Sequence, residues 1–301
     1  MADAGARVRG LLLGATLVWG VNLTVLKWLL GSFDPVVLSG LRMVAATVPM
    51  LVLLRHWRCW QTPTAAQWRQ LIVCGVLMVY LNQWLLAEGL ARSSATNGAL
   101  ITSLNPLMAA VLALWLLRER LTGRRLVGVL LGLAGVALVI LSRPGAELAR
   151  GGAGDGLVIL AVLVFTLGAV IVQRLMGQLN AVVIGLVIHS VGAACLLLQA
   201  ALTAGVSGQG PQAPTLLWPW AVAVLSGALS TGIGNLAWNR AIGLVGMARA
   251  AVWLYWVPLF GVASAVVFLG EPLTPWHVMG LGLVLLGTRL GTRAAPPGPA
   301  T

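Results

Sequence analysis

Long apolar runs recur along the whole chain, separated by short polar or arginine-bearing connections. Each run has roughly the 20 residues that a helix needs to cross a hydrocarbon core of about 30 Å. In lipid the backbone groups must pair within the segment, which favours helices, and the alternation typical of a β-barrel is absent. The pattern predicts an all-α integral membrane protein with ten transmembrane helices, at residues 10–30, 35–54, 70–90, 96–117, 123–142, 156–176, 179–202, 217–241, 247–269 and 275–292.

Composition supports this interpretation. The 301 residues are 59% hydrophobic and 9% charged, whereas a soluble domain has about 25% charged residues. The first run follows MADAGARVRG. It is longer than the apolar region of a typical signal peptide and lacks a clear cleavage site, so we interpret it as a helix. The composition of the end of the chain, residues 293–301, predicts a disordered tail.

One phrase occurs twice. PLMAAVLALWLLRERLT at 106–122 and PLFGVASAVVFLGEPLT at 258–274 align without a gap at an offset of 152 residues. A weaker match at an offset of 146 pairs 17–27 with 163–173. We therefore predict two five-helix repeats, 1–142 and 156–292, joined by an external linker, 143–155. The offset of 152 also pairs glycines outside the phrase: Gly75 with Gly227, Gly128 with Gly280, and Gly135 with Gly287.

The positive charges predict the orientation of the repeats. If the N-terminus is cytoplasmic, 14 Lys and Arg residues lie inside and 4 outside, with Arg42 within a span, which follows the positive-inside rule. Both termini are then cytoplasmic. Five is an odd number, so the second repeat is inverted, and the cytoplasmic Arg118 and Arg120 match the external Gly270 and Pro272. The net charge of +12 thus indicates topology and no nucleic acid partner.

Inverted repeats are a design of secondary transporters, with a site near the midplane at the repeat interface. Duplication in a membrane protein that transports nothing is the alternative. No G-x-x-x-x-G-K-[ST] phosphate loop occurs. An enzyme is disfavoured because the three histidines are scattered and neither H-E-x-x-H nor G-x-S-x-G occurs. We expect no metal, no cofactor and, from Cys59, Cys74 and Cys195, no disulfide.

The two repeats, each with a proline, a helix ending in Glu-x-Leu-Thr and then a glycine-spaced helix, resemble the EamA family of the drug/metabolite transporter superfamily. The resemblance covers nearly the whole chain. It implies a central cavity and alternating access for a small metabolite across the bacterial inner membrane. Export of amino acids or related compounds is the expected function, and import or efflux of drug-like compounds, purines or sugars is the alternative. Substrate, direction, ion or proton coupling and oligomeric state stay open.

Arg42 is a charged side chain predicted to lie within a span. A guanidinium at the bilayer centre costs about 2.5–3.5 kcal/mol on insertion scales, so it must face protein or water. It either binds a substrate carboxylate or pairs with Glu88, and we favour the pair. Glu88 is also the one candidate proton site.

Five residues are candidates for structural or gating roles. Glu119 and Glu271 end their helices before Thr122 and Thr274, which are placed as N-caps, and each Glu either braces the turn or forms a gate salt bridge. A proline within a helix frees the carbonyl four residues back, so Pro106 and Pro258 predict kinks, either passive or at the binding site. Structural or gating roles are thus expected for Glu88, Pro106, Glu119, Pro258 and Glu271.

The remaining candidates are polar and aromatic residues within spans. Buried amides need partners, and helix–helix hydrogen bonding is the alternative to a cavity wall. His189 is expected to be a core histidine. The predicted substrate-binding residues are Trp19, Asn22, Arg42, Tyr80, Gln83, Trp84, Asn105, Asn235, Trp238, Asn239, Trp253 and Tyr255.

Overall fold

The computed structural model describes residues 2–105, 107–108, 112, 123–141, 151–207, 212–235, 237–238, 241 and 252–292. Predictions for Pro106, Glu119, Thr122, Asn239, the side chain of Tyr255 and the tail 293–301 lie outside this part of the chain. The described residues form helices and connections and include no strand.

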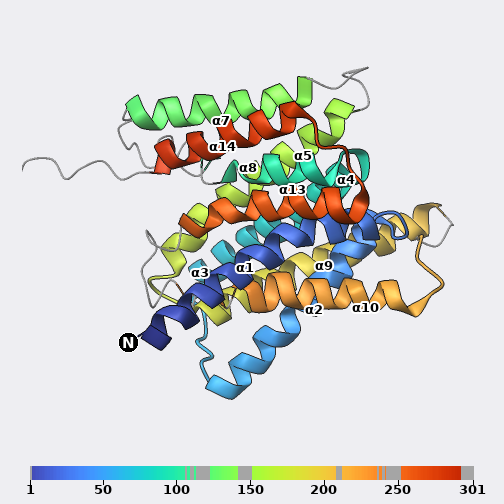
Figure 1. The fold of residues 1–301 in the computed structure, drawn as a ribbon. Helices are drawn as coiled ribbons and strands as arrows, with labels where there is room; N and C mark the ends of the chain where they lie inside the picture. Colours follow the sequence, from blue (N-terminus) through green and yellow to red (C-terminus); the bar gives the residue numbers. More distant parts are fainter. Residues whose placement is uncertain are drawn as a thin grey trace, which may run out of the picture.

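The helices run close to one another along one common direction (Figure 1). Their bounds are α1 Ala2–Leu29, α2 Pro35–Trp57, α3 Ala65–Cys74, η1 Gly75–Leu81, α4 Asn82–Arg92, α5 Ala95–Thr102, α7 Gly123–Leu141, α8 Gly151–Leu175, α9 Ala181–Ser207, α10 Leu217–Ser226, η2 Gly227–Ile233, η3 Val252–Tyr255, α13 Trp256–Leu269 and α14 Pro275–Thr292.

Five helices are long and apolar enough to cross a membrane. They are Arg9–Leu29, Pro35–Trp57, Ala65–Arg92, Gly152–Leu175 and Ala181–Val206, and they match five of the predicted spans. Shorter apolar helices cover Leu126–Val139, Leu217–Ile233 and Trp256–Leu269. The ten-span count depends partly on residues outside the described part. Several boundaries differ from the prediction: α1 begins at Ala2, α3 begins at Ala65, and α8 begins at Gly151, within the expected linker.

Local sequence explains several helix starts. Asp34 caps α2, where its Oδ1 accepts from the backbone N–H groups of Val36 at 2.9 Å and Val37 at 3.1 Å, and Pro35 occupies the first turn. Proline suits that position because its missing N–H has no partner there anyway. Thr64 and Gln67 form a reciprocal capping box at α3. These caps define the residues at which α2 and α3 begin.

In each predicted repeat, the third helix is interrupted by one seven-residue π-helical segment. η1 covers Gly75–Leu81 and η2 covers Gly227–Ile233, so their bounds match at the same offset of 152 residues that pairs Pro106 with Pro258. Segments of π-helix are rare and occur frequently at functional sites. The repeat in the sequence is therefore accompanied by a repeat of an unusual backbone geometry.

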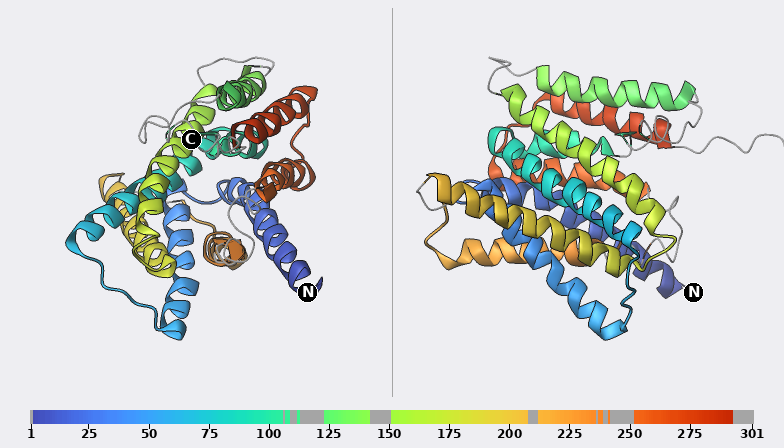
Figure 2. Two further views of the ribbon diagram at one scale, coloured as in Figure 1. Left: turned by 90° about the vertical axis from the view of Figure 1, so that its left-hand side faces the viewer. Right: turned by 180° about the vertical axis from the view of Figure 1, so that it is seen from behind.

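Helices α7 and α14 lie side by side at one edge of the molecule (Figures 1 and 2). A Cβ added to Gly135 would lie 2.7 Å from the carbonyl oxygen of Gly280, and one added to Gly287 would lie 2.5 Å from that of Gly128. Residue number rises along one helix as it falls along the other, so the two helices are antiparallel. The offset of 152 exchanges these two contacts, which is the pattern that two inverted copies produce.

The expected kinks can be followed at the described residues beside the two prolines. The carbonyl of Thr102 ends α5 and accepts from Nδ2 of Asn105 at 2.8 Å. At the equivalent place before Pro258, Val252–Tyr255 forms a 3-10 helix in place of an α-helix. The regular hydrogen-bond ladder is thus interrupted ahead of both prolines.

Candidate functional site

One cavity of about 980 Å³ lies between the two predicted repeats. Its walls come from α1, α2, η1 and α4 of the first repeat, and from α8, α9 and η2 of the second. These are the first three spans of each half, and both π-helical segments contribute. Interrupted helices at corresponding positions of two repeats are the expected surroundings of a transporter site.

The cavity is open at one end and closed at the other. Its lining extends along α1 from Leu11 to Asn22, a distance of about 16 Å at 1.5 Å per residue, which is roughly half the thickness of a bilayer core. The open end is formed by Trp57, Met176 and Asn180, where α2 and α8 end.

Beyond Asn22 the helices pack closely. Thr24 and Ser264 share a hydrogen bond of 2.7 Å between α1 and α13. At the level of the cavity, a Cβ on Gly20 would lie 2.6 Å from Cβ of Phe260, so α1 also packs closely on α13 there. One turn beyond Thr24, Nζ of Lys27 donates to the carbonyl of Leu90 at 2.7 Å. The cavity therefore ends inside the molecule.

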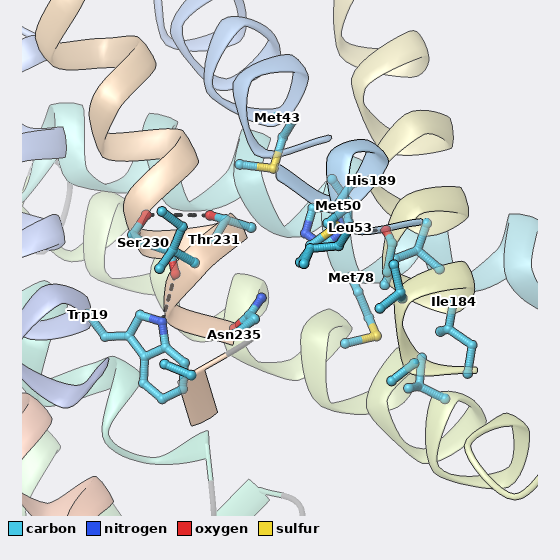
Figure 3. Close-up of a pocket in the computed structure, with 18 of the residues that line it drawn as sticks. Trp19, Met43, Met50, Leu53, Met78, Ile184, His189, Ser230, Thr231 and Asn235 are labelled. Carbon is cyan, nitrogen blue, oxygen red and sulfur yellow. Dashed lines mark hydrogen bonds between the residues drawn. The ribbon is translucent and has the colours of Figure 1, made fainter. Parts of the chain in front are cut away.

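Most of the wall is apolar, and methionines are prominent in it. Met43, Met50, Met78 and Met176 line the cavity, and the first three are labelled in Figure 3. Methionine is unbranched and polarisable, so it adapts to ligands of different shape. The sequence analysis did not single out these residues, although Met43 and Met50 stand seven residues apart and so share a face of α2.

A cluster of residues with polar groups lies on one side of the cavity (Figure 3). The indole Nε1 of Trp19 donates to the backbone carbonyl of Ser230 in η2 at 2.9 Å. Trp238 packs on Trp19 with ring centroids 5.3 Å apart. Asn235 and Thr231 complete this side of the wall. Of the predicted substrate-binding residues, Trp19, Asn22, Gln83 and Asn235 line the cavity, and Trp238 stands directly behind it.

Arg42 is buried beside the inner end of the cavity, with 1% of its surface exposed. Its Nη2 donates to Oδ1 of Asn22 at 2.6 Å, and its Nε donates to Oγ of Ser226 at 3.1 Å. The backbones of α2 and η2 also approach closely here, because a Cβ on Gly227 would lie 2.3 Å from the carbonyl oxygen of Arg42. η2 thus packs against the backbone of α2 at this residue.

The predicted Arg42–Glu88 pair is wrong for this structure. Glu88 pairs with Arg92, one turn away on α4, and both lie at a partly exposed helix end. Arg42 instead faces hydroxyl and amide groups. Hydropathy placed both residues correctly along their helices, but it does not show the rotation of a helix about its axis. Glu88 also lies outside the cavity wall, so the structure gives no support to its role as a proton site.

Glu271 has a different role from bracing its own turn. Its Oε1 accepts from the backbone N–H of Ala95 at 2.7 Å and its Oε2 from that of Thr96 at 2.8 Å. These N–H groups begin α5, where Ser94 is the N-cap. A carboxylate is favoured there by the helix dipole. Glu271 therefore joins the α13–α14 connection of the second repeat to a helix of the first. Thr274 precedes α14 as expected, and its hydroxyl bonds to Nδ1 of His277 at 2.8 Å.

Other predicted binding residues are used for packing. Tyr80 and Trp84 stack on each other at 6.2 Å within a core cluster. Trp253 packs near Leu12 and Ala241. The amide of Asn105 bonds within its own helix turn, as described above. None of these four residues is among those lining the cavity.

His189 lines the cavity. Its Nδ1 lies 2.7 Å from the carbonyl oxygen of Gly185. Because a carbonyl only accepts, Nδ1 carries the hydrogen and Nε2 is left as an acceptor. The residue is thus satisfied by its own helix, as expected of a core histidine, while one nitrogen stays available to a ligand. The described residues hold no cluster of potential metal ligands, and the three cysteines are free.

Known proteins resemble this chain over its whole length. The model of the EamA-like transporter family matches residues 9–141 and, separately, 152–292. An uncharacterized transporter of Bacillus subtilis is 25% identical over 282 residues, covering 92% of this chain and 90% of the relative. A probable terminal-alkyne amino-acid exporter of Streptantibioticus cattleyicolor is 25% identical, covering 92% and 93%. A solved crystal structure shares the fold, with a TM-score of 0.67 at 18% identity, covering 95% and 96%.

Proposed function

The chain belongs to the EamA-like transporter family, and from this premise we propose that it exports amino acids or related small metabolites by alternating access. Like the family and the relatives that it resembles, it is a multi-pass membrane transporter and not an enzyme. The observation that carries the finer proposal is the cavity, which runs from the exposed Trp57 and Met176 to a cluster of polar side chains between equivalent helices of the two repeats.

The positive charges assign a side to the open end of the cavity. Arg55 and Arg58 end α2, and Arg174 lies in the last turn of α8, so all three are at the open end. By the positive-inside rule this end faces the cytoplasm. An inward-open state belongs to the cycle of an importer as well as of an exporter, so the proposed direction rests on the similarity to a probable amino-acid exporter. The similarity to a probable amino-acid exporter points to the same class of solute.

Efflux of varied organic compounds is the second candidate. The methionine-lined wall favours it, because such a surface repacks around ligands of different shape. The volume of about 980 Å³ also exceeds what one amino acid fills. Both candidates use the same cavity and differ in how strictly its polar end selects the solute.

Counterflow in proteoliposomes tests the proposal. Purified protein is reconstituted and screened with labelled apolar amino acids and, in a parallel series, with labelled aromatic cations. We expect saturable exchange of at least one amino acid and none in protein-free liposomes. Exchange of the cations alone would favour the efflux candidate, and no saturable exchange with either series would contradict transport.

A pair of glycine variants on α9 shows whether solute passes through this cavity. Gly185 lies in the wall, where an added Cβ would meet only the flexible end of Met50, at 3.3 Å from Sδ. Gly205, on the same helix, has nothing within 4 Å. We expect Gly185→Leu to fill the cavity and reduce exchange at least tenfold, while Gly205→Leu leaves it unchanged. Equal rates in the two variants would contradict the proposed route.

A further inference from the structure

Arg42 carries a positive charge without a counter-charge among its described partners. It bonds to Asn22, Ser226 and, at 3.5 Å, to Oγ of Ser230, all of which are neutral. Its Nη1 is buried and has no hydrogen-bond partner. A buried charge costs several kcal/mol unless it is paired, and ionisable groups within membrane spans commonly mark substrate paths. The fold thus retains a cation with one donor unused at the end of the cavity.

The donors of Arg42 fix the orientation of the neighbouring amide. A guanidinium has no acceptor, so the atom of Asn22 that lies 2.6 Å from Nη2 is the oxygen Oδ1. The NH₂ group of Asn22 then lies on the other side of the amide. Asn22 lines the cavity, and because its Oδ1 already accepts from Arg42, the NH₂ group is the donor that it can offer to a ligand. Arg42 therefore polarises the donor of a cavity-lining residue.

Gln83 presents the opposite polarity. Its Nε2 donates to Oδ1 of Asn82 at 2.9 Å, and Nδ2 of Asn82 donates to the carbonyl of Ala161 at 2.9 Å. The chain of bonds ends on a carbonyl, which only accepts, so both amides are fixed and Oε1 of Gln83 remains an acceptor in the cavity wall. Ser39 donates to the backbone carbonyl of Gln83 at 3.3 Å, which places Gln83 beside α2, about one helix turn from Arg42.

We propose that the inner end of the cavity recognises the carboxylate of a small zwitterion, with Asn22 as the direct donor and Arg42 as the counter-charge behind it. Oε1 of Gln83 accepts from the ammonium group, and the methionine-lined wall receives the apolar remainder. This proposal rests on the proposed function and narrows it, because it makes a free carboxylate the required feature of the solute. Arg42 and Asn22 are then the residues that determine specificity.

A ligand series measures the requirement for the carboxylate. The thermal unfolding midpoint of the purified full-length protein is recorded with L-leucine, 4-methylpentanoate, leucinamide and isopentylamine. A ligand that binds the folded state raises the midpoint by mass action. We expect L-leucine to bind most tightly, 4-methylpentanoate more weakly, and the two compounds without a carboxylate at least tenfold more weakly than L-leucine. Equal binding of leucinamide and L-leucine, or binding of none of the four, would overturn the proposal.

Asn22→Asp is the decisive variant. It places a carboxylate of nearly the same shape against Arg42 and so supplies internally the counter-charge that the ligand is proposed to bring. We expect a higher unfolding midpoint without ligand and at least a tenfold loss of L-leucine affinity, which is about 1.4 kcal/mol. Thr16→Val on the same helix is the control, because the hydroxyl of Thr16 bonds only to carbonyls of α1. Unchanged L-leucine affinity in Asn22→Asp would overturn the proposal.

Two further outcomes separate this proposal from others. If titration of chloride into a chloride-free sulfonate buffer raises the midpoint and carboxylates add nothing, Arg42 holds an inorganic anion and the proposal fails. If the counterflow assay shows exchange of solutes without a carboxylate, the proposed specificity fails while transport stands. Absence of all exchange, with carboxylate-dependent binding intact, would instead remove transport and leave the binding site.

Discussion

At the scale of single residues, the two glutamates Glu271 and Glu88 have different roles. Glu271 accepts from two backbone N–H groups of a helix in the other repeat, whereas Glu88 pairs with a neighbour on its own helix. Hydrogen bonds to a charged group contribute about 1.5–3 kcal/mol each, but exposed ion pairs contribute roughly 0–1 kcal/mol. The same residue type therefore carries different weight at the two positions.

Replacing these glutamates by glutamine separates the two roles. In Glu271→Gln one carboxylate oxygen becomes an NH₂ group, which opposes a backbone N–H of α5 and leaves it unpaired. We expect a loss of about 1.5–3 kcal/mol of stability, measured as a lower thermal unfolding midpoint in detergent. Glu88→Gln is the matched control and is expected to cost at most about 1 kcal/mol. The prediction is wrong if the two variants unfold at the same temperature.

Sequence reasoning placed residues along the helices well and around them poorly. Arg42, Asn22 and Gln83 were candidates because their polarity conflicts with an apolar span. Arg42 bonds to Asn22, and both Asn22 and Gln83 line the cavity. Tyr80 and Trp84 were candidates on chemistry alone, and they turn away into a core cluster. The π-helical turns change which side chains face inward, and the hydropathy pattern does not contain that change.

At the scale of elements, glycines decide where helices approach most closely. α7 and α14 pack through the crossed contacts of Gly135 with Gly280 and of Gly287 with Gly128. The sequence analysis paired these glycines only through the offset of 152. In the structure both members of each contacting pair belong to one chain.

Two glycines of α14 give a matched test of this packing. In Gly287→Ala the new methyl group would lie 2.5 Å from the carbonyl oxygen of Gly128, whereas at Gly282 nothing lies within 4 Å. We expect Gly287→Ala to lower stability by about 1–3 kcal/mol through overpacking, and Gly282→Ala to change it by less than about 0.5 kcal/mol. Thermal unfolding of the two purified variants measures the difference. A similar midpoint for both would show that α7 and α14 separate easily.

At the scale of the whole molecule, the two halves are related by sequence, by the family match and by geometry. The family model matches twice, at 9–141 and 152–292, and the π-helical segments recur at the same offset as the proline motifs. The all-helical membrane class followed from the apolar runs, while the count of ten helices stays a prediction. The closed end of the cavity did not follow from the sequence, because it depends on contacts such as that between Thr24 and Ser264, which join segments far apart in the chain.

Accessibility labelling tests the proposed inversion. α7 begins at Gly123 and α14 at Pro275, and these residues are equivalent at the offset of 152. After the three native cysteines are replaced, single cysteines are placed at 123 and at 275 in intact cells. We expect a membrane-impermeant thiol reagent to label 275 from outside and 123 only after the membrane is permeabilised. Labelling of both positions from the same side would contradict the inversion.

The crossed glycine contact of α7 and α14 has a mechanical consequence. Exchange of the two halves converts the contact of Gly135 with Gly280 into that of Gly287 with Gly128. The packing of α7 on α14 is therefore the same whichever side of the membrane the cavity opens to. Such a contact is suited to be a stationary pivot, about which the helices around the cavity swing while it neither forms nor breaks. A covalent tether across it should leave transport intact, whereas one joining α1 to α13 near Thr24 and Ser264 should keep the closed end of the cavity shut.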